Sequence, residues 1–126
     1  MEPVNLFNLA SRQAEWLAVR QSAVAGNIAN ANTPGYTAND VEPFQKVLDH
    51  TAVTLGATQS GHLGFGASEA AFSVKPQDYT GAIMPSKNTV VMEEELMKAG
   101  EVRRSFELNT AIVKAFHTMM IMATKG

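Results

Sequence analysis

Apolar residues recur at alternating steps of three and four at both ends of the chain, and this spacing restricts the fold more than any other feature. The N-terminal positions, seven of them apolar, are Phe7, Ala10, Ala14, Leu17, Gln21, Val24, Ile28 and Ala31. The C-terminal positions, again with one polar residue, are Ala99, Val102, Phe106, Asn109, Val113, Phe116, Met120 and Ala123. A mean spacing of about 3.5 residues is typical of coiled coils. The sequence therefore predicts a long helix at each end.

Neither helix can bury its apolar stripe alone, so the simplest solution is for the two to pack on each other. A long middle segment lets the chain return, which predicts a mainly α fold with an antiparallel, coiled-coil-like hairpin and a loop-rich, partly disordered middle. We expect three parts: the N-terminal helix and its turn (1–36), a short helix plus loops (37–88), and the C-terminal helix (89–126). Apolar spacing at Val41, Phe44, Val47 and Leu48 indicates the short helix.

The polar residue in each stripe suggests a register for the hairpin. If Phe7 lies level with Ala123, Gln21 faces Asn109 and Val24 faces Phe106. Buried polar pairs can fix register at some cost in stability. The expected hairpin seam comprises Phe7, Leu17, Gln21, Val24, Ile28, Val102, Phe106, Asn109, Val113, Phe116 and Met120.

A second apolar stripe lies one residue before each seam. Its members, which we take as candidates for contacts between subunits, are Leu6, Leu9, Trp16, Leu108, Ile112, Met119 and Met122. In an antiparallel hairpin this surface exceeds what one helix pair can hide, and exposed apolar patches usually mark interaction surfaces. The alternative is that the middle segment folds back and covers the stripe.

The stretch "NIANANTPGY" predicts that the first helix stops at a fixed place. Thr33 precedes Pro34 and is biased away from helical angles. Gly35 can adopt positive φ and complete a type II turn. Asn30 and Asn32 can cap exposed carbonyl groups or adopt left-handed conformations, and Tyr36 can pack its ring on the helix with its hydroxyl in water.

The second long helix begins after a run of glutamates. Glu93, Glu94 and Glu95 suit a first turn, where exposed backbone N–H groups favour negative charge, and Asn88 or Thr89 is the expected cap. Consecutive helical residues point in different directions, so these carboxylates do not form a facing catalytic pair. A solvated first turn or a charge contact with a neighbouring subunit explains them better.

Composition and motifs argue against catalysis and nucleic-acid binding. The formal net charge of −2 and the pI of about 5.9 do not favour a nucleic-acid partner, and the absence of cysteine excludes disulfides and thiol chemistry. His50, His62 and His117 lack metal-ligand spacing, and His117 is expected to flank or enter the helix core. We expect no enzyme activity, cofactor, metal or small-molecule substrate.

The N-terminus lacks the features of a cleaved signal peptide, and no stretch approaches the roughly 20 apolar residues of a membrane span. By these signals the chain is expected in the cytoplasm, unless a dedicated machine exports uncleaved chains.

The segment "GNIANANTPGY" resembles the N-terminal signature of bacterial flagellar axial proteins, the family of rod, hook and hook-associated subunits. The family's turn motif is matched at Asn27, Asn30, Thr33, Pro34, Gly35 and Tyr36. The short length and "NTVVMEEELMKAGE" are similar to proximal-rod members. The resemblance covers roughly residues 1–45 and 85–126.

This resemblance implies a structural subunit of the flagellar proximal rod, located in the periplasm. It implies export without a cleaved signal by the flagellar type III apparatus, and assembly through the terminal helices. The implied partners are other rod proteins, the adaptor between membrane ring and rod, and further copies of the chain. Two alternatives remain open: another axial rod subunit, or a cytoplasmic coiled-coil adaptor or export chaperone.

Overall fold

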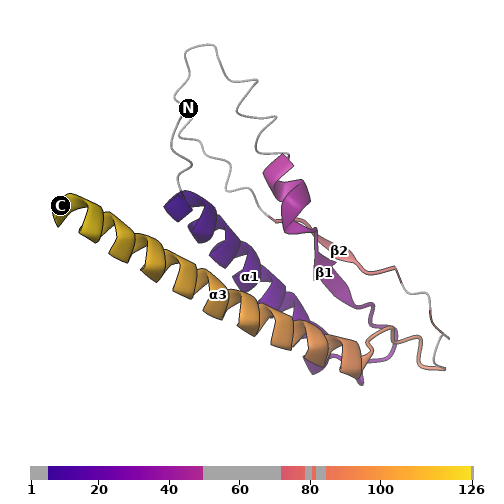
Figure 1. Ribbon diagram of the computed structural model, residues 1–126. Helices are drawn as coiled ribbons and strands as arrows, with labels where there is room; N and C mark the ends of the chain where they lie inside the picture. The colour runs from indigo at the N-terminus through magenta and orange to yellow at the C-terminus, as the bar shows by residue number, and fades with distance from the viewer. Residues whose placement is uncertain (1–5, 50–71, 79–80, 82–84, 126) are drawn as a thin grey trace, which may run out of the picture.

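The computed structural model describes residues 6–49, 72–78, 81 and 85–125. Two long helices lie side by side, and a small sheet and a short helical segment lie next to α1 (Figure 1). The elements are α1 (Leu6–Ala29), β1 (Asn39–Val41), a helical stretch at residues 44–49, β2 (Val74–Pro76) and α3 (Met92–Lys125).

The predicted mainly α fold with an antiparallel helix hairpin is confirmed. Phe7 at the start of α1 packs edge-on against Phe116 near the end of α3, with ring centroids 5.3 Å apart. At the opposite end of the hairpin, Asn27 contacts Glu95 at 3.1 Å. The expectation of partial disorder falls mainly on residues 50–71, which lie outside the described residues.

A two-stranded antiparallel sheet, which the sequence did not predict, joins the two sides of the middle segment. β1 pairs with β2 so that Asn39 lies opposite Pro76 and Val41 lies opposite Val74. Strands of three residues are too short to produce a readable alternation of apolar and polar residues, so periodicity could not reveal them. Val41 is buried, and this strand contributes to the small core beside α1.

The core of the hairpin follows every seventh residue of each helix. The buried positions within the two helices are Ala10, Leu17 and Val24 on α1 and Glu95, Val102 and Asn109 on α3, together with Asn27. Leu17 and Val102 are nearly inaccessible, and burial of each such side chain stabilises the hairpin by about 2 kcal/mol. The seam positions between them are half-buried or exposed, because two helices alone hide only a narrow strip of each other.

The predicted register is wrong by one heptad. Phe7 packs on Phe116 rather than lying level with Ala123. The Asn109 side chain donates to the carbonyl oxygen of Ala10 at 2.9 Å and to Gln13 Oε1 at 3.3 Å, whereas Gln21 is exposed. An apolar pattern that repeats every seven residues fits registers that differ by seven equally well, so the pattern alone could not choose between them.

Because of this register, α3 continues past the first residue of α1 (Figure 1). Residues 117–125, which we call the C-terminal overhang, make more than two helical turns, or roughly 13 Å. All nine residues are exposed, including Met119, Met120, Ile121 and Met122. Among the described residues, no helix combines the length and apolarity needed to cross a membrane.

Candidate functional site

The turn that follows α1 is closed by its own side chains. The Asn30 side-chain amide donates to the carbonyl oxygen of Gly26 at 2.8 Å, and Asn30 Oδ1 accepts from the Thr33 hydroxyl at 3.1 Å. The Gly26 carbonyl oxygen also accepts from the backbone N–H of Asn30 at 3.1 Å, so the side-chain amide adds a second bond to it. Asn30 therefore reinforces the end of the helix, but it does not give a partner to an otherwise unpaired carbonyl group, as the predicted cap would.

Thr33 to Tyr36 form the predicted tight turn. The backbone N–H of Tyr36 donates to the carbonyl oxygen of Thr33 at 3.2 Å, which closes a four-residue turn. Gly35, the third residue of this turn, has φ of 75°, the positive value that a type II turn requires at that position. Pro34 occupies the second position, where its fixed φ favours this turn.

Asn88 holds the turn from the other side of the molecule. Its side-chain amide lies 2.8 to 2.9 Å from the carbonyl oxygens of Asn30, Ala31 and Thr33, and its Oδ1 accepts from the backbone N–H of Val90 at 2.8 Å. Asn88 is only 4% exposed. The turn after α1 is thus held by a residue 58 positions later than the first of these carbonyl groups.

The prediction that Asn88 or Thr89 caps the second helix is therefore wrong. α3 begins at Met92, and its first backbone bond runs from the N–H of Glu95 to the carbonyl oxygen of Val91. The Thr89 hydroxyl oxygen accepts from the backbone N–H of Ala38 at 2.8 Å. Both side chains form hydrogen bonds with residues 30–38. The sequence around Asn88 and Thr89 gave no sign that this earlier segment lies beside them.

Backbone bonds complete the attachment of the turn. The N–H of Gly35 donates to the carbonyl oxygen of Ser86 at 2.8 Å, and the N–H of Thr89 donates to that of Tyr36 at 3.1 Å. The segment at residues 35–38 therefore runs against residues 86–89, directly before α3. This contact fixes the direction in which the chain leaves α1.

Asn27, the first residue of the motif, is fully buried at the centre of the site. Its amide donates to the carbonyl oxygen of Asn39 at 2.7 Å and to Glu95 Oε2 at 3.1 Å. Its Oδ1 accepts from the N–H of Asn39 at 2.9 Å and from the Tyr36 hydroxyl at 3.2 Å. These four bonds use the full capacity of the side chain. The hydroxyl of Tyr36 was expected to face water, and instead it bonds to Asn27.

Glu95 is buried and paired, which corrects the expectation of a solvated first turn. The side chain is 1% exposed, and Oε1 contacts Lys98 Nζ at 3.3 Å. Lys98 also contacts Asp40 at 3.6 Å and donates to Gln77 at 2.8 Å. A carboxylate can be buried only with such partners, because an unpaired buried charge is strongly unfavourable. Glu95 therefore links α1, α3 and the sheet.

The other two glutamates behave as expected, since Glu93 and Glu94 are exposed. The sequence did contain a signal that Glu95 is buried. One further step of four back from Ala99 along the C-terminal seam reaches Glu95. A charged residue at a seam position indicates a buried partner on the facing helix, which here is Asn27.

Polar contacts recur between the two helices and fix their register. Each pairs one side chain of α1 with one of α3, at 3.3, 3.4 and 3.1 Å: Gln13 with Asn109, Arg20 with Glu101, and Asn27 with Glu95. The α1 members are spaced by seven residues. A slip of one heptad would break all three pairs and leave the buried amides without partners.

Trp16, a candidate for contacts between subunits, lies against the middle segment instead. Its Nε1–H donates to the carbonyl oxygen of Glu42 at 2.8 Å, and its ring lies 5.7 Å from that of Phe44. The Arg20 guanidinium lies 5.5 Å from the Trp16 ring centroid. For Trp16, the alternative is therefore the correct one: the middle segment covers this part of the N-terminal stripe.

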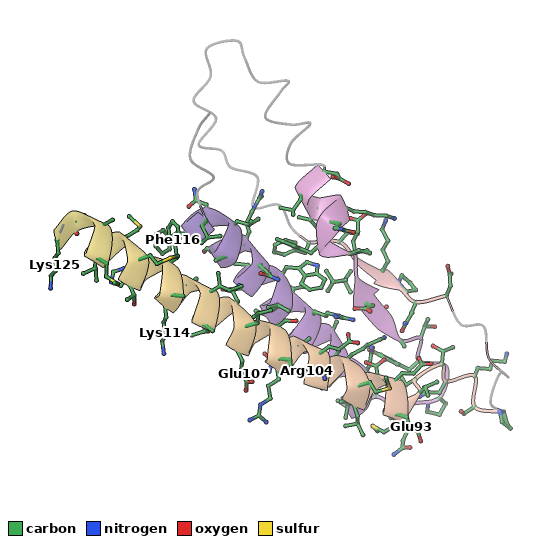
Figure 2. All side chains as sticks on the ribbon, in the orientation of Figure 1. Glu93, Arg104, Glu107, Lys114, Phe116 and Lys125 are labelled. Carbon is green, nitrogen blue, oxygen red and sulfur yellow. The ribbon has the colours of Figure 1, made fainter. Side chains whose placement is uncertain are left out.

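The remaining candidates divide between the helices. Leu6 and Leu9 on α1 are half-buried. On α3, Leu108, Ile112, Met119 and Met122 are 44% to 68% exposed. Charged side chains also line the outer side of α3, where Figure 2 labels Arg104, Glu107, Lys114 and Lys125. The free apolar stripe therefore belongs to α3.

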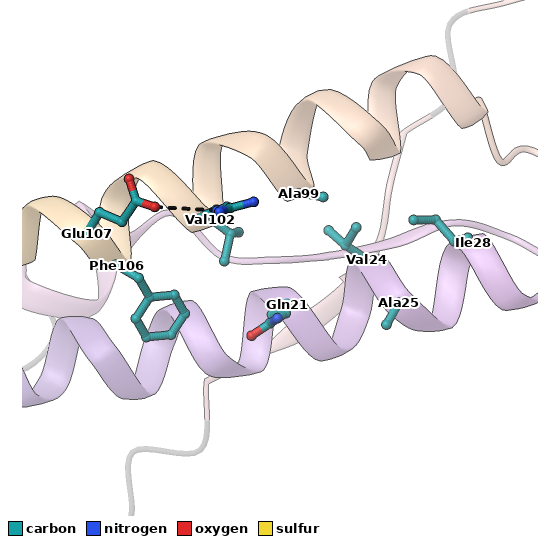
Figure 3. A pocket seen from close by; sticks show the side chains of 9 residues that line it. Gln21, Val24, Ala25, Ile28, Ala99, Val102, Phe106 and Glu107 are labelled. Carbon is teal, nitrogen blue, oxygen red and sulfur yellow. Dashed lines mark hydrogen bonds and ion pairs between the residues drawn. The ribbon is translucent and has the colours of Figure 1, made fainter.

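An open, mainly apolar groove of about 410 Å³ lies between α1 and α3 near the turn (Figure 3). Its apolar lining comprises Val24, Ala25, Ile28, Ala99, Val102 and Phe106. An exposed pair, Arg103 with Glu107 at 3.4 Å, stands at its edge. Of the other predicted seam residues, Val113 and Phe116 are half-buried, and Phe7 and Met120 are exposed.

The described residues offer no group of three or more His, Cys, Asp or Glu side chains that could hold a metal ion. His117 is exposed on the overhang, and His50 and His62 lie outside the described residues. Within that same part of the chain, every buried side-chain nitrogen and oxygen has a hydrogen-bond partner. The polar residues around the turn thus serve to hold the fold.

Comparisons with known proteins agree with this arrangement. A family profile described as "Flagella basal body rod protein" matches residues 11–37, which contain most of α1 and the whole turn. The chain is also 46% identical to the flagellar basal body rod protein FlgB of Agrobacterium fabrum. That alignment covers 99% of this chain and 96% of that protein. The chain therefore belongs to the family of flagellar basal body rod proteins and is a structural subunit of the rod.

Proposed function

We propose that the chain builds the proximal, periplasmic part of the flagellar rod and that it acts by burying helical surface between neighbouring subunits. The observation that carries this proposal is the apolar stripe on α3, where Leu108, Ile112, Met119 and Met122 remain largely exposed. Exposed apolar surface of this extent favours association over an isolated existence. We assign the protein no catalytic activity.

The turn gives this surface a fixed relation to the rest of the subunit. Asn88 and Asn27 attach the end of α1 to residues 86–95 and to β1. Rigid attachment lowers the entropy cost of assembly, because less of the subunit must be ordered when it joins. The turn therefore sets the angle between the hairpin and the segment that contains the sheet.

The proposed partners follow from this role. They are other rod subunits, further copies of this chain, and the adaptor between the membrane ring and the rod. We propose delivery by the flagellar type III export apparatus without cleavage of a signal. Neither nucleic acid nor a small-molecule substrate forms part of the proposal.

Gly35→Val tests the role of the turn in cells. Valine at a φ of 75° is strained by at least about 1–2 kcal/mol, although nothing lies within 4 Å of the added Cβ. We expect less of the variant in purified basal bodies and reduced swimming in a strain that lacks its own copy of the gene.

Gly100→Ala is the matched control. Gly100 lies within α3 with open space at its Cβ, so alanine there should stabilise the helix by about 1 kcal/mol and leave swimming unchanged. Normal swimming and normal basal-body content with Gly35→Val would contradict the proposal. Retention of the unaltered chain in the cytoplasm would instead point to an adaptor or chaperone.

A further inference from the structure

We propose that the C-terminal overhang of one copy docks in the groove between α1 and α3 of a second copy. This inference rests on the proposed function, because it names the partner of the surface by which the subunit assembles. The contact is heterologous: one copy contributes its overhang, and the next contributes its groove.

The two surfaces match in length. The overhang covers nine residues, and the α3 side of the groove extends over the nine residues from Ala99 to Glu107. Each therefore extends over roughly 13 Å of helix. The groove is lined mainly by apolar side chains of both helices, and the overhang presents three methionines and one isoleucine.

Methionine suits this contact physically. Its unbranched side chain fits irregular apolar gaps, such as the opening beside Val24 and Phe106. Met119 and Met122 are 59% and 68% exposed, so docking would remove apolar surface that the single subunit leaves in water.

Charge along α3 favours the same pairing. Residues 92–107 contain five glutamates against one lysine and two arginines, whereas the overhang contains one lysine, Lys125, and no acidic residue. Figure 2 places Glu93 and Lys125 at opposite ends of α3. Lys125 of the overhang is complementary to the net negative half of α3 in a second copy, whereas two overhangs side by side would bring their two lysines together.

A heterologous contact also leaves each docked subunit with a free surface. Once the overhang of one copy is buried, its own groove can still accept the next copy. Repetition of such a contact produces a ring or an open helical assembly. An exchange of overhangs between only two copies would instead use both surfaces and close the assembly.

Cysteine cross-linking tests the contact directly, because the natural chain contains no cysteine. One chain carries Met122→Cys, and a second chain, distinguished by a tag, carries Ala25→Cys in the groove. The control partner carries Ser11→Cys, which is exposed on α1 outside the groove. Under mild oxidation we expect the Met122→Cys chain to link to Ala25→Cys at least about tenfold more than to Ser11→Cys, because docking raises the local thiol concentration.

A chain with both Met122→Cys and Ala25→Cys should give trimers and longer products. Equal linking to the control, self-linking of Met122→Cys alone as the main product, or a ladder that ends at the dimer would overturn the inference. Basal bodies isolated from cells that carry the double variant distinguish a failure of the docking contact from a failure of the proposed function. If the chain is present there without links, the docking fails and the rod role remains. If links form in solution and the chain is absent from basal bodies, the rod role fails instead.

Discussion

Asn88→Ala should destabilise the folded chain more than its position in a connecting segment would indicate. The substitution removes a donor to the carbonyl oxygens of Asn30, Ala31 and Thr33 and an acceptor for the N–H of Val90. Alanine fills none of these roles. The turn after α1 would lose the side-chain bonds by which Asn88 attaches it to the segment before α3, while the backbone bonds from Gly35 and Thr89 remain.

The magnitude follows from the groups left without partners. The carbonyl oxygens of Asn30 and Thr33 keep backbone bonds, from the N–H groups of Thr33 and Tyr36, so their loss is partial. The carbonyl oxygen of Ala31 and the buried N–H of Val90 lose the bonds that Asn88 supplies. Each such group costs about 1–3 kcal/mol, which gives a loss in unfolding free energy of about 3 kcal/mol.

Urea denaturation followed by far-ultraviolet circular dichroism and by the fluorescence of the single tryptophan, Trp16, measures this loss. A decrease of about 3 kcal/mol lowers the urea midpoint by roughly 1–3 M. Asn32→Ala is the matched control, since Asn32 is exposed in the same turn and its side chain makes no hydrogen bond in the described part of the chain. Equal midpoints for the two variants would refute the role of Asn88 in holding the turn after α1.

Two further substitutions test neighbouring contacts by urea denaturation, followed by circular dichroism alone for Trp16→Phe, which removes the fluorescent side chain. Glu95→Ala should lower the unfolding free energy by about 2 kcal/mol, because a buried N–H of Asn27 loses its acceptor, while Glu94→Ala on the exposed side should change it little. Trp16→Phe keeps an aromatic ring beside Phe44 and removes the bond to the Glu42 carbonyl, so it should cost about 1 kcal/mol. Equal effects of the two glutamate substitutions, or a Trp16→Phe midpoint like that of the unaltered chain, would contradict these assignments.

The helices could be predicted from sequence because their signal is local and repeated. Spacing at steps of three and four requires no knowledge of the partner helix, and the turn residues act within four positions of one another. The register could not be predicted in the same way. It depends on which polar groups meet, and Asn109 finds the carbonyl oxygen of Ala10 and not Gln21.

The attachment of the turn was beyond sequence reasoning for a related reason. Asn88 is of a residue type that often caps helices, so the local sequence predicted that it caps the helix that follows. Its actual acceptors lie in a turn far earlier in the chain. Glu95 has the same side chain as its two neighbours; its seam position marks it in the sequence, but its partner Asn27 is known only from the structure. Properties that depend on a distant partner require the structure.

The long separation between Asn88 and the turn also affects the order of folding. α1 can form early, because its backbone bonds are local and close quickly. The contacts that fix its end join segments 55 to 58 residues apart, and the entropy of closing such a loop must be overcome before those contacts form. The direction of the chain after α1, which is synthesised first, is therefore fixed only by contacts with the half that is synthesised last. Until residues 86–95 have been synthesised, the turn at residues 30–36 lacks these contacts, and the angle at which the chain leaves α1 is not fixed.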